Sequence, residues 1–137
     1  KEIKIRNKKS TRPWQHVLDP LCGYLCLAES MDKSPEITST SFNFGPSAES
    51  NRSVEEVINQ LIDFWPGEWI DSSDLKSVHE ANLLNLVTEK SRNILNWNSK
   101  WDFNTTIKNT VFWYKDFYSN KLIAKECCQR DIEFFMM

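Results

Sequence analysis

Three side chains near the amino end of the chain have types and spacing suited to binding a ligand. Arg12, Trp14 and His16 alternate along the sequence, so they would share one face if this stretch were an extended strand. That face would offer a cation, a stacking surface and a hydrogen-bonding ring to one ligand. An arginine on a solvated strand, a core tryptophan and a satisfied histidine are the alternatives, and these residues by themselves do not exclude them.

The stretch that carries these side chains is expected to lead directly into a helix. Asp19 is predicted to cap that helix and Pro20 to occupy its first position, where a missing N–H costs nothing. Upstream, Lys1 to Arg6 alternates like a strand, and Asn7 to Ser10 supplies a polar turn, so we predict a hairpin at the amino end. Binding residues often collect at such a rigid yet open place.

The remaining elements follow from helical periodicity, caps and breakers. Ser53 and Glu56 form a capping box, and apolar residues then recur at helical spacing as far as Trp65. Asp102 is predicted to cap a further long helix. The predicted helices span about 20–31, 54–65, 88–95, 102–119 and 122–134; a short strand spans 41–45, loops span 32–40 and 68–78, and 79–87 is extended. The sum is a helix-rich α+β fold with two to four short strands.

Composition places the chain among globular proteins and excludes several functions. Its 137 residues are 40% hydrophobic and 26% charged, which predicts one domain, 1–137, with a single core. The net charge of −2 argues against general nucleic-acid binding, although six of the first twelve residues are basic. Because no apolar run approaches the roughly 20 residues of a membrane span and no signal peptide opens the chain, we expect no membrane partner and a cytoplasmic location.

The four cysteines predict neither a zinc site nor a disulfide framework. Cys22 and Cys26 share a helix face, Cys127 and Cys128 are adjacent, and both histidines lie far from them in sequence. We therefore expect Cys22 and Cys26 to be core thiols and no metal to be bound. Because the chain begins with Lys1 instead of methionine, we also expect it to be a fragment or a processed form of a longer protein.

Five motifs in order give the chain a resemblance to a known family. They are Arg-Pro-Trp-Gln-His-Val-Leu-Asp-Pro-Leu from Arg12 with Gly-Tyr-Leu from Gly23, Phe-Asn-Phe-Gly-Pro from Phe42, His-Glu-Ala-Asn-Leu-Leu from His79, the pair Trp97 and Trp101, and Thr-Val-Phe-Trp-Tyr from Thr110. Together they resemble the substrate-binding, carboxy-terminal portion of the CDP-glucose 4,6-dehydratases, which are extended short-chain dehydrogenases that act on nucleotide sugars. Nearly the whole chain takes part in this resemblance.

The resemblance implies a substrate-binding role for four residues. Arg12 would face the substrate diphosphate, which a planar guanidinium can clamp through two hydrogen bonds. Asn43 would contact the nucleotide phosphates, unless it caps its own turn. His79 would donate to phosphate, and Glu80 would accept from the ribose or base. The expected strand face adds Trp14 and His16 to these substrate-binding residues.

Catalysis in the resembling family needs groups that this chain does not encode. Its glycines, Gly23, Gly45 and Gly67, form no glycine-rich turn for the pyrophosphate of NAD. The pair Tyr118 and Lys121 has the wrong spacing for the catalytic Tyr and Lys. We therefore expect no catalytic residues, no bound cofactor and no turnover by this chain alone. NAD and the Rossmann domain would belong to the complete enzyme, with the missing domain as a partner.

Two other functions remain open. The first is a stand-alone helical domain derived from that fold, whose aromatic surface binds a protein. The second, a nucleic-acid binder that uses the basic arm from Lys1 to Arg12, is disfavoured by the acidic remainder of the chain.

Overall fold

The computed structural model describes residues 2–73 and 84–137, and it has the helix-rich architecture with small sheets that the sequence predicts. Its helices are α1 (Leu18–Lys33), α2 (Val54–Phe64), α3 (Glu89–Leu95), α4 (Phe103–Tyr118) and α5 (Ala124–Met136), with short 3₁₀ turns at η1 (Pro35–Ser39) and η2 (Ala48–Ser50). Its strands are β1 (Ile3–Ile5), β2 (Thr11–Pro13), β3 (Asn51–Ser53) and β4 (Trp69–Asp71). None of the helices in this part of the chain is both long and apolar enough to cross a membrane.

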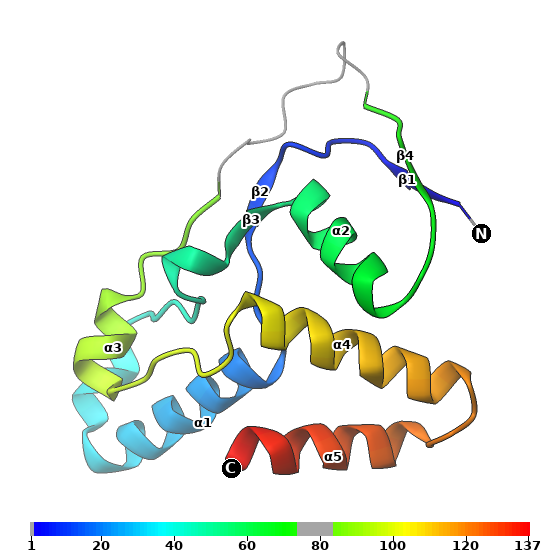
Figure 1. Cartoon of the computed structure of the whole chain (residues 1–137). Coiled ribbons are helices and arrows are strands. Elements are labelled where there is room, and N and C mark those ends of the chain that lie inside the picture. The colour runs from blue at the N-terminus through cyan, green and yellow to red at the C-terminus, as the bar shows by residue number, and fades with distance from the viewer. Residues whose placement is uncertain (1, 74–83) are drawn as a thin grey trace.

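The strands pair between distant segments, so the predicted amino-terminal hairpin is wrong. β1 lies parallel to β4 with Ile3 opposite Trp69, and β2 lies antiparallel to β3 with Arg12 opposite Arg52 (Figure 1). The turn between β1 and β2 does form, since the Ser10 N–H donates to Asn7 Oδ1 at 3.2 Å. After this turn, however, β2 joins a different partner. β4 lies where the sequence predicted a loop, and β3 was not predicted.

The segment from Phe42 to Gly45 is not a strand, contrary to the sequence prediction. Its carbonyl oxygens accept hydrogen bonds from side chains instead of from a neighbouring strand. Gln15 Nε2 donates to Phe44 O at 3.0 Å, and Ser91 Oγ donates to Asn43 O at 2.7 Å. These side-chain partners satisfy the backbone in an irregular conformation.

The predicted caps hold for two helices and fail at the first. Ser53 and Glu56 form the reciprocal capping box of α2, and the Asp102 carboxylate accepts from the Thr105 N–H at the start of α4. α1, however, begins at Leu18. Asp19 is therefore inside the helix and fully buried, where Oδ1 accepts from the Lys100 N–H at 2.6 Å. Instead of capping α1, Asp19 therefore joins this helix to the segment before α4.

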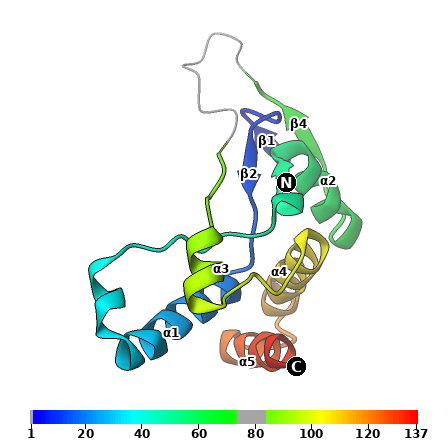
Figure 2. The ribbon, with the colours of Figure 1, turned by 90° about the vertical axis from the view of Figure 1, so that its left-hand side faces the viewer.

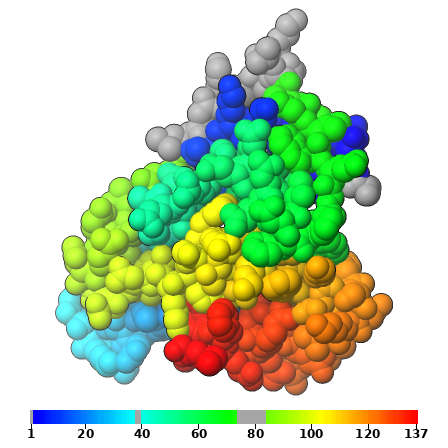
Figure 3. Space-filling model, viewed as in Figure 1, coloured from blue at the N-terminus to red at the C-terminus, as the bar shows by residue number. Residues whose placement is uncertain are grey.

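Among residues 2–73 and 84–137, buried apolar side chains form two clusters that different helices cover. One cluster lies between α1 and α3 and contains Phe44, Leu95 and Trp97. The other lies between α2 and α4 and contains Val57, Ile107 and Val111. Figure 2 shows α3 beside α1, and Figure 3 shows α2 (green) above α4 (yellow to orange) with α5 (red) below it. α4 thus lies between α2 and α5.

The apolar side chains of α1 and α4 are only partly buried. On α1, Leu21 and Leu25 are exposed, whereas Cys22 and Cys26 pack against the first cluster, as expected for core thiols. On α4, Ile107 and Val111 are buried, but Tyr114 and Phe117 reach the surface. Gly23 explains the orientation of α1: a Cβ there would lie 2.3 Å from the Phe44 ring, so the helix presents its smallest residue to the core.

Candidate functional site

Arg12 lies in a pair of strands that brings two arginines opposite each other. Arg12 on β2 faces Arg52 on β3, and Arg12 Nη1 donates to Thr11 O at 2.7 Å. Arg52 Nη1 is 3.3 Å from Glu56 Oε1, and its guanidinium lies 5.9 Å from the centre of the Phe103 ring. Like charges opposite each other in a strand pair repel, so an anion near both guanidinium groups would be stabilised.

Trp14 is held by contacts within the chain. It packs against the cluster of Val57, Ile107 and Val111, and its indole N–H donates to Arg52 O at 2.8 Å. β2 ends at Pro13, so the strand alternation that would place Arg12, Trp14 and His16 on one face stops before Trp14. In the fold, Trp14 holds β2 and β3 against α2 and α4.

His16 is a buried imidazole. Its ring centre lies 4.5 Å from that of Trp101, and its Nδ1 accepts from the Leu18 N–H at 3.4 Å. Burial lowers the pKa of His16, an effect that the nearby Asp131 carboxylate partly opposes. The ring therefore offers a hydrogen bond from Nε2 instead of a positive charge for a phosphate.

Asn43 is exposed and connects two of the motif segments. Its Nδ2 donates to Val87 O at 3.1 Å, and the neighbouring Phe44 accepts from Gln15 of the first motif. A Cβ on Gly45 would lie 2.9 Å from Leu86, so the glycine permits this close approach of the two segments. The structure thus brings together two motif segments, those of Gln15 and Phe44, and the stretch at Leu86 and Val87, which are far apart in sequence. His79 and Glu80 lie outside the described residues.

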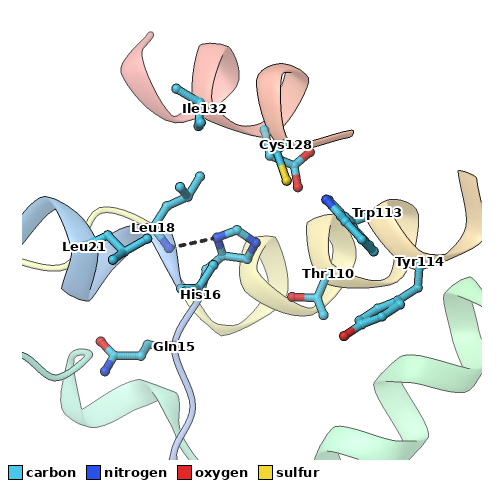
Figure 4. A pocket seen from close by; sticks show the side chains of 11 residues that line it. Gln15, His16, Leu18, Leu21, Thr110, Trp113, Tyr114, Cys128 and Ile132 are labelled. Atoms are coloured by element: carbon cyan, nitrogen blue, oxygen red, sulfur yellow. Dashed lines mark hydrogen bonds between the residues drawn. The ribbon is translucent and has the colours of Figure 1, made fainter. Parts of the chain in front are cut away.

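A cavity of about 530 Å³ lies beside His16, between α1, α4 and α5 (Figure 4). Its lining residues are Gln15, His16, Val17, Leu18, Leu21, Thr110, Trp113, Tyr114, Cys128, Asp131 and Ile132. Arg12 and Asn43 are not among them. Of the predicted site residues that the structure describes, His16 faces this cavity, whereas Arg12 lies in the strand pair and Asn43 lies beside Val87.

Sequence reasoning missed several polar residues that organise this region. Gln15 and Ser91 fix the segment from Phe42 to Gly45, and Asp131 adds a buried carboxylate to the cavity. Asp19 was noticed only as a cap, and burial raises the pKa of its carboxyl group. No local pattern distinguishes Gln15, Ser91 or Asp131 from surface polar residues, because their partners lie far away in sequence.

None of the described His, Cys, Asp and Glu side chains group into a set of three or more that could hold a metal ion. The four cysteines are free thiols, with Cys127 buried and Cys128 exposed at the cavity. Burial raises the pKa of the Cys127 thiol, so it behaves as an apolar core side chain.

The geometry defines a small helix-rich chain whose amino-terminal motif, Phe42–Gly45 segment and α3 region meet around α1.

Comparison with known proteins confirms the resemblance seen in the sequence. The chain is 31% identical over 137 residues to a CDP-glucose 4,6-dehydratase of Salmonella typhimurium (strain LT2). The match covers 98% of this chain and 38% of that relative, so the chain spans well under half of the relative's length. No family model matches the chain.

Proposed function

We propose that this chain is a nucleotide-sugar-binding portion of a protein related to the CDP-glucose 4,6-dehydratases, with CDP-glucose or a similar nucleotide sugar as its ligand. The observation that carries the proposal is the similarity to that enzyme, which extends over 98% of the chain. We further propose that NAD and the catalytic Tyr and Lys are supplied by a Rossmann domain outside this sequence, so that this chain binds substrate without turning it over.

The charge and position of three residues, Arg12, Arg52 and Asn43, support this proposal. Arg12 and Arg52 lie opposite each other, which favours an anion such as a diphosphate near both guanidinium groups. Asn43 is exposed and has a side-chain amide, a group that can donate to phosphate or hydroxyl oxygens. We assign the diphosphate to Arg12 and a further phosphate or sugar contact to Asn43. His79 and Glu80 remain proposed contacts to phosphate and to ribose or base.

A titration with CDP-glucose, followed by amide NMR shifts and compared with UDP-glucose, tests the proposal. We expect saturable shifts around Arg12 and Asn43. Absence of any shift at millimolar CDP-glucose would contradict the proposal. Stronger shifts with UDP-glucose would retain the nucleotide-sugar site but assign it a different base.

A second function, a stand-alone protein-interaction domain, is favoured by one specific observation. Large apolar side chains are exposed on two helices: Leu21, Tyr24 and Leu25 on α1, and Ile132, Phe134 and Met136 on α5. Exposed apolar groups of this kind, where they are contiguous, mark contact surfaces. Failure to bind any nucleotide sugar, together with self-association or partner binding that Leu25→Glu abolishes, would favour this second function.

A further inference from the structure

The cavity beside His16 has the size and lining of a ligand site, and the proposed nucleotide-sugar function does not use it. Its volume of about 530 Å³ is within the range of small-molecule pockets. Most of its walls are apolar, with Leu18 and Leu21 from α1, Trp113 from α4 and Ile132 from α5 (Figure 4). An apolar ring would replace water against these walls favourably.

Two buried polar groups line the same cavity. His16 accepts at Nδ1 from the Leu18 N–H, so its own proton lies on Nε2, which is thus a donor. Asp131 is 4% exposed, and its Oδ1 accepts from Arg130 Nε at 3.0 Å. Its Oδ2 has no hydrogen-bond partner within residues 2–73 and 84–137. A buried carboxylate oxygen without a partner costs free energy, which a donor in the cavity would recover.

The pairing of one donor with one acceptor selects the chemistry of the ligand. A hydroxyl group can accept from an imidazole N–H and donate to a carboxylate at the same time. An anion is disfavoured beside the Asp131 carboxylate, because the Arg130 guanidinium that pairs with it also pairs with Asp116 and leaves no excess positive charge. We propose that this cavity binds a neutral, ring-sized molecule with an apolar body and one hydroxyl group, which donates to Asp131 Oδ2 and accepts from His16 Nε2.

This site is separate from the proposed nucleotide-sugar site. Neither Arg12 nor Asn43 lines the cavity, and a diphosphate is the wrong charge for it. An ordered water could make the same two hydrogen bonds, but water would leave the apolar walls without a favourable contact. The ring and the hydroxyl are therefore both needed, and each can be removed from a probe independently.

Three small probes test the proposal: 4-methylphenol, toluene and 4-methylbenzoate. Binding to the full chain is followed by carbon-13 methyl NMR of Leu18, Leu21 and Ile132. We expect saturable shifts with 4-methylphenol at millimolar concentration or below. Toluene, which lacks the hydroxyl, should bind at least about tenfold more weakly, and the anionic 4-methylbenzoate should not bind. No saturable shift with 4-methylphenol, or equal affinity for toluene, would overturn the proposal.

A pair of variants on the same helix locates the binding. Leu21→Trp places a large ring at the cavity, and Leu25→Trp is the matched control, because Leu25 is 72% exposed and does not line it. Leu21 is itself 46% exposed, so the change is expected to leave the fold intact. We expect Leu21→Trp to abolish binding of 4-methylphenol and Leu25→Trp to preserve it. Wild-type affinity in Leu21→Trp would overturn the proposal, while CDP-glucose shifts near Arg12 test the nucleotide-sugar site separately.

Discussion

Arg12 and His16 are only four residues apart, yet they lie in opposite electrostatic environments. Arg12 lies on a strand opposite a second arginine, Arg52, which is paired with Glu56. His16 is buried beside Trp101, where charge is penalised and the ring stays neutral. The change occurs because the chain leaves β2 at Pro13 and enters α1 at Leu18. Under the two proposals above, one short motif therefore serves two sites, a strand pair that binds an anion and a helix-lined cavity that binds a neutral molecule.

Gly23→Ala should have the largest effect, because Gly23 lies where α1 packs against the Phe42–Gly45 segment. The new Cβ would be 2.3 Å from the Phe44 ring, and overpacking of this kind costs about 1–3 kcal/mol. We expect urea denaturation to show this loss of unfolding free energy. Gly67→Ala is the control, because the nearest atom to its Cβ is 4.0 Å away. Equal stability of the two variants would contradict the close packing of α1 on Phe44.

Arg12→Gln tests whether the two sites are independent. Loss of a charge-assisted hydrogen bond should weaken CDP-glucose binding about tenfold, while binding of 4-methylphenol at the cavity stays unchanged. Leu21→Trp should show the reverse pattern. Arg92→Gln, an exposed arginine on α3 that donates to Asn98, is the matched control for the loss of one charge. Equal losses in Arg12→Gln and Arg92→Gln would assign the effect to net charge alone.

Removing the cap of α2 or of α4 should lower the free energy of unfolding by less than Gly23→Ala does, and by a similar amount at each helix. Ser53→Ala removes the cap of α2 beside the strand pair, and Asp102→Ala removes the cap of α4 beside the cavity. Each should lower the unfolding free energy by about 1 kcal/mol, measured by urea denaturation. Thr88→Ala is the control, because the Thr88 side chain makes no cap hydrogen bond to α3. A loss in Thr88→Ala as large as in the other two would show that capping is not the cause.

The smallest expected effect is a pH dependence caused by His16. Its pKa in the folded protein is lowered from 6.5, chiefly by burial, so the unfolded chain takes up a proton first as the pH falls. The contribution of His16 to the free energy of unfolding is therefore complete above pH 6.5 and declines as the pH falls below 6.5. Proton NMR of the imidazole should show His16 titrating below 6.5. A midpoint above 6.5 would mean that Asp131 outweighs burial and that the cavity holds a cation.

The sequence predicted best those features whose causes lie within a few residues. The capping box at Ser53, the cap at Asp102 and the helices that follow them depend on hydrogen bonds between near neighbours. The last helix was predicted two residues early, at 122–134, because no capping Ser, Thr, Asp or Asn side chain marks its start and Ile123 occupies that position. The order of the five motifs also sufficed to reveal the resemblance that the comparison confirmed.

Prediction of the candidate sites was weaker, because neighbours in sequence were assigned to one face. Arg12 and His16 were expected together, and the end of β2 at Pro13 separates them. Asp131 was not considered, since an acidic residue on a helix has no pattern that marks burial. Its position opposite His16 depends on how α5 packs against α4, which no local motif specifies.

The sequence by itself determined the helix-rich class, the caps of α2 and α4, and the resemblance to a nucleotide-sugar enzyme, because these depend on local spacing and motif order. The tertiary structure alone decided that β1 pairs with β4, that β2 pairs with β3, and that Asp19 is buried instead of capping. It also decided which helices enclose the cavity. Each of these depends on contacts between distant segments, whose free energy is gained only when the whole chain has packed.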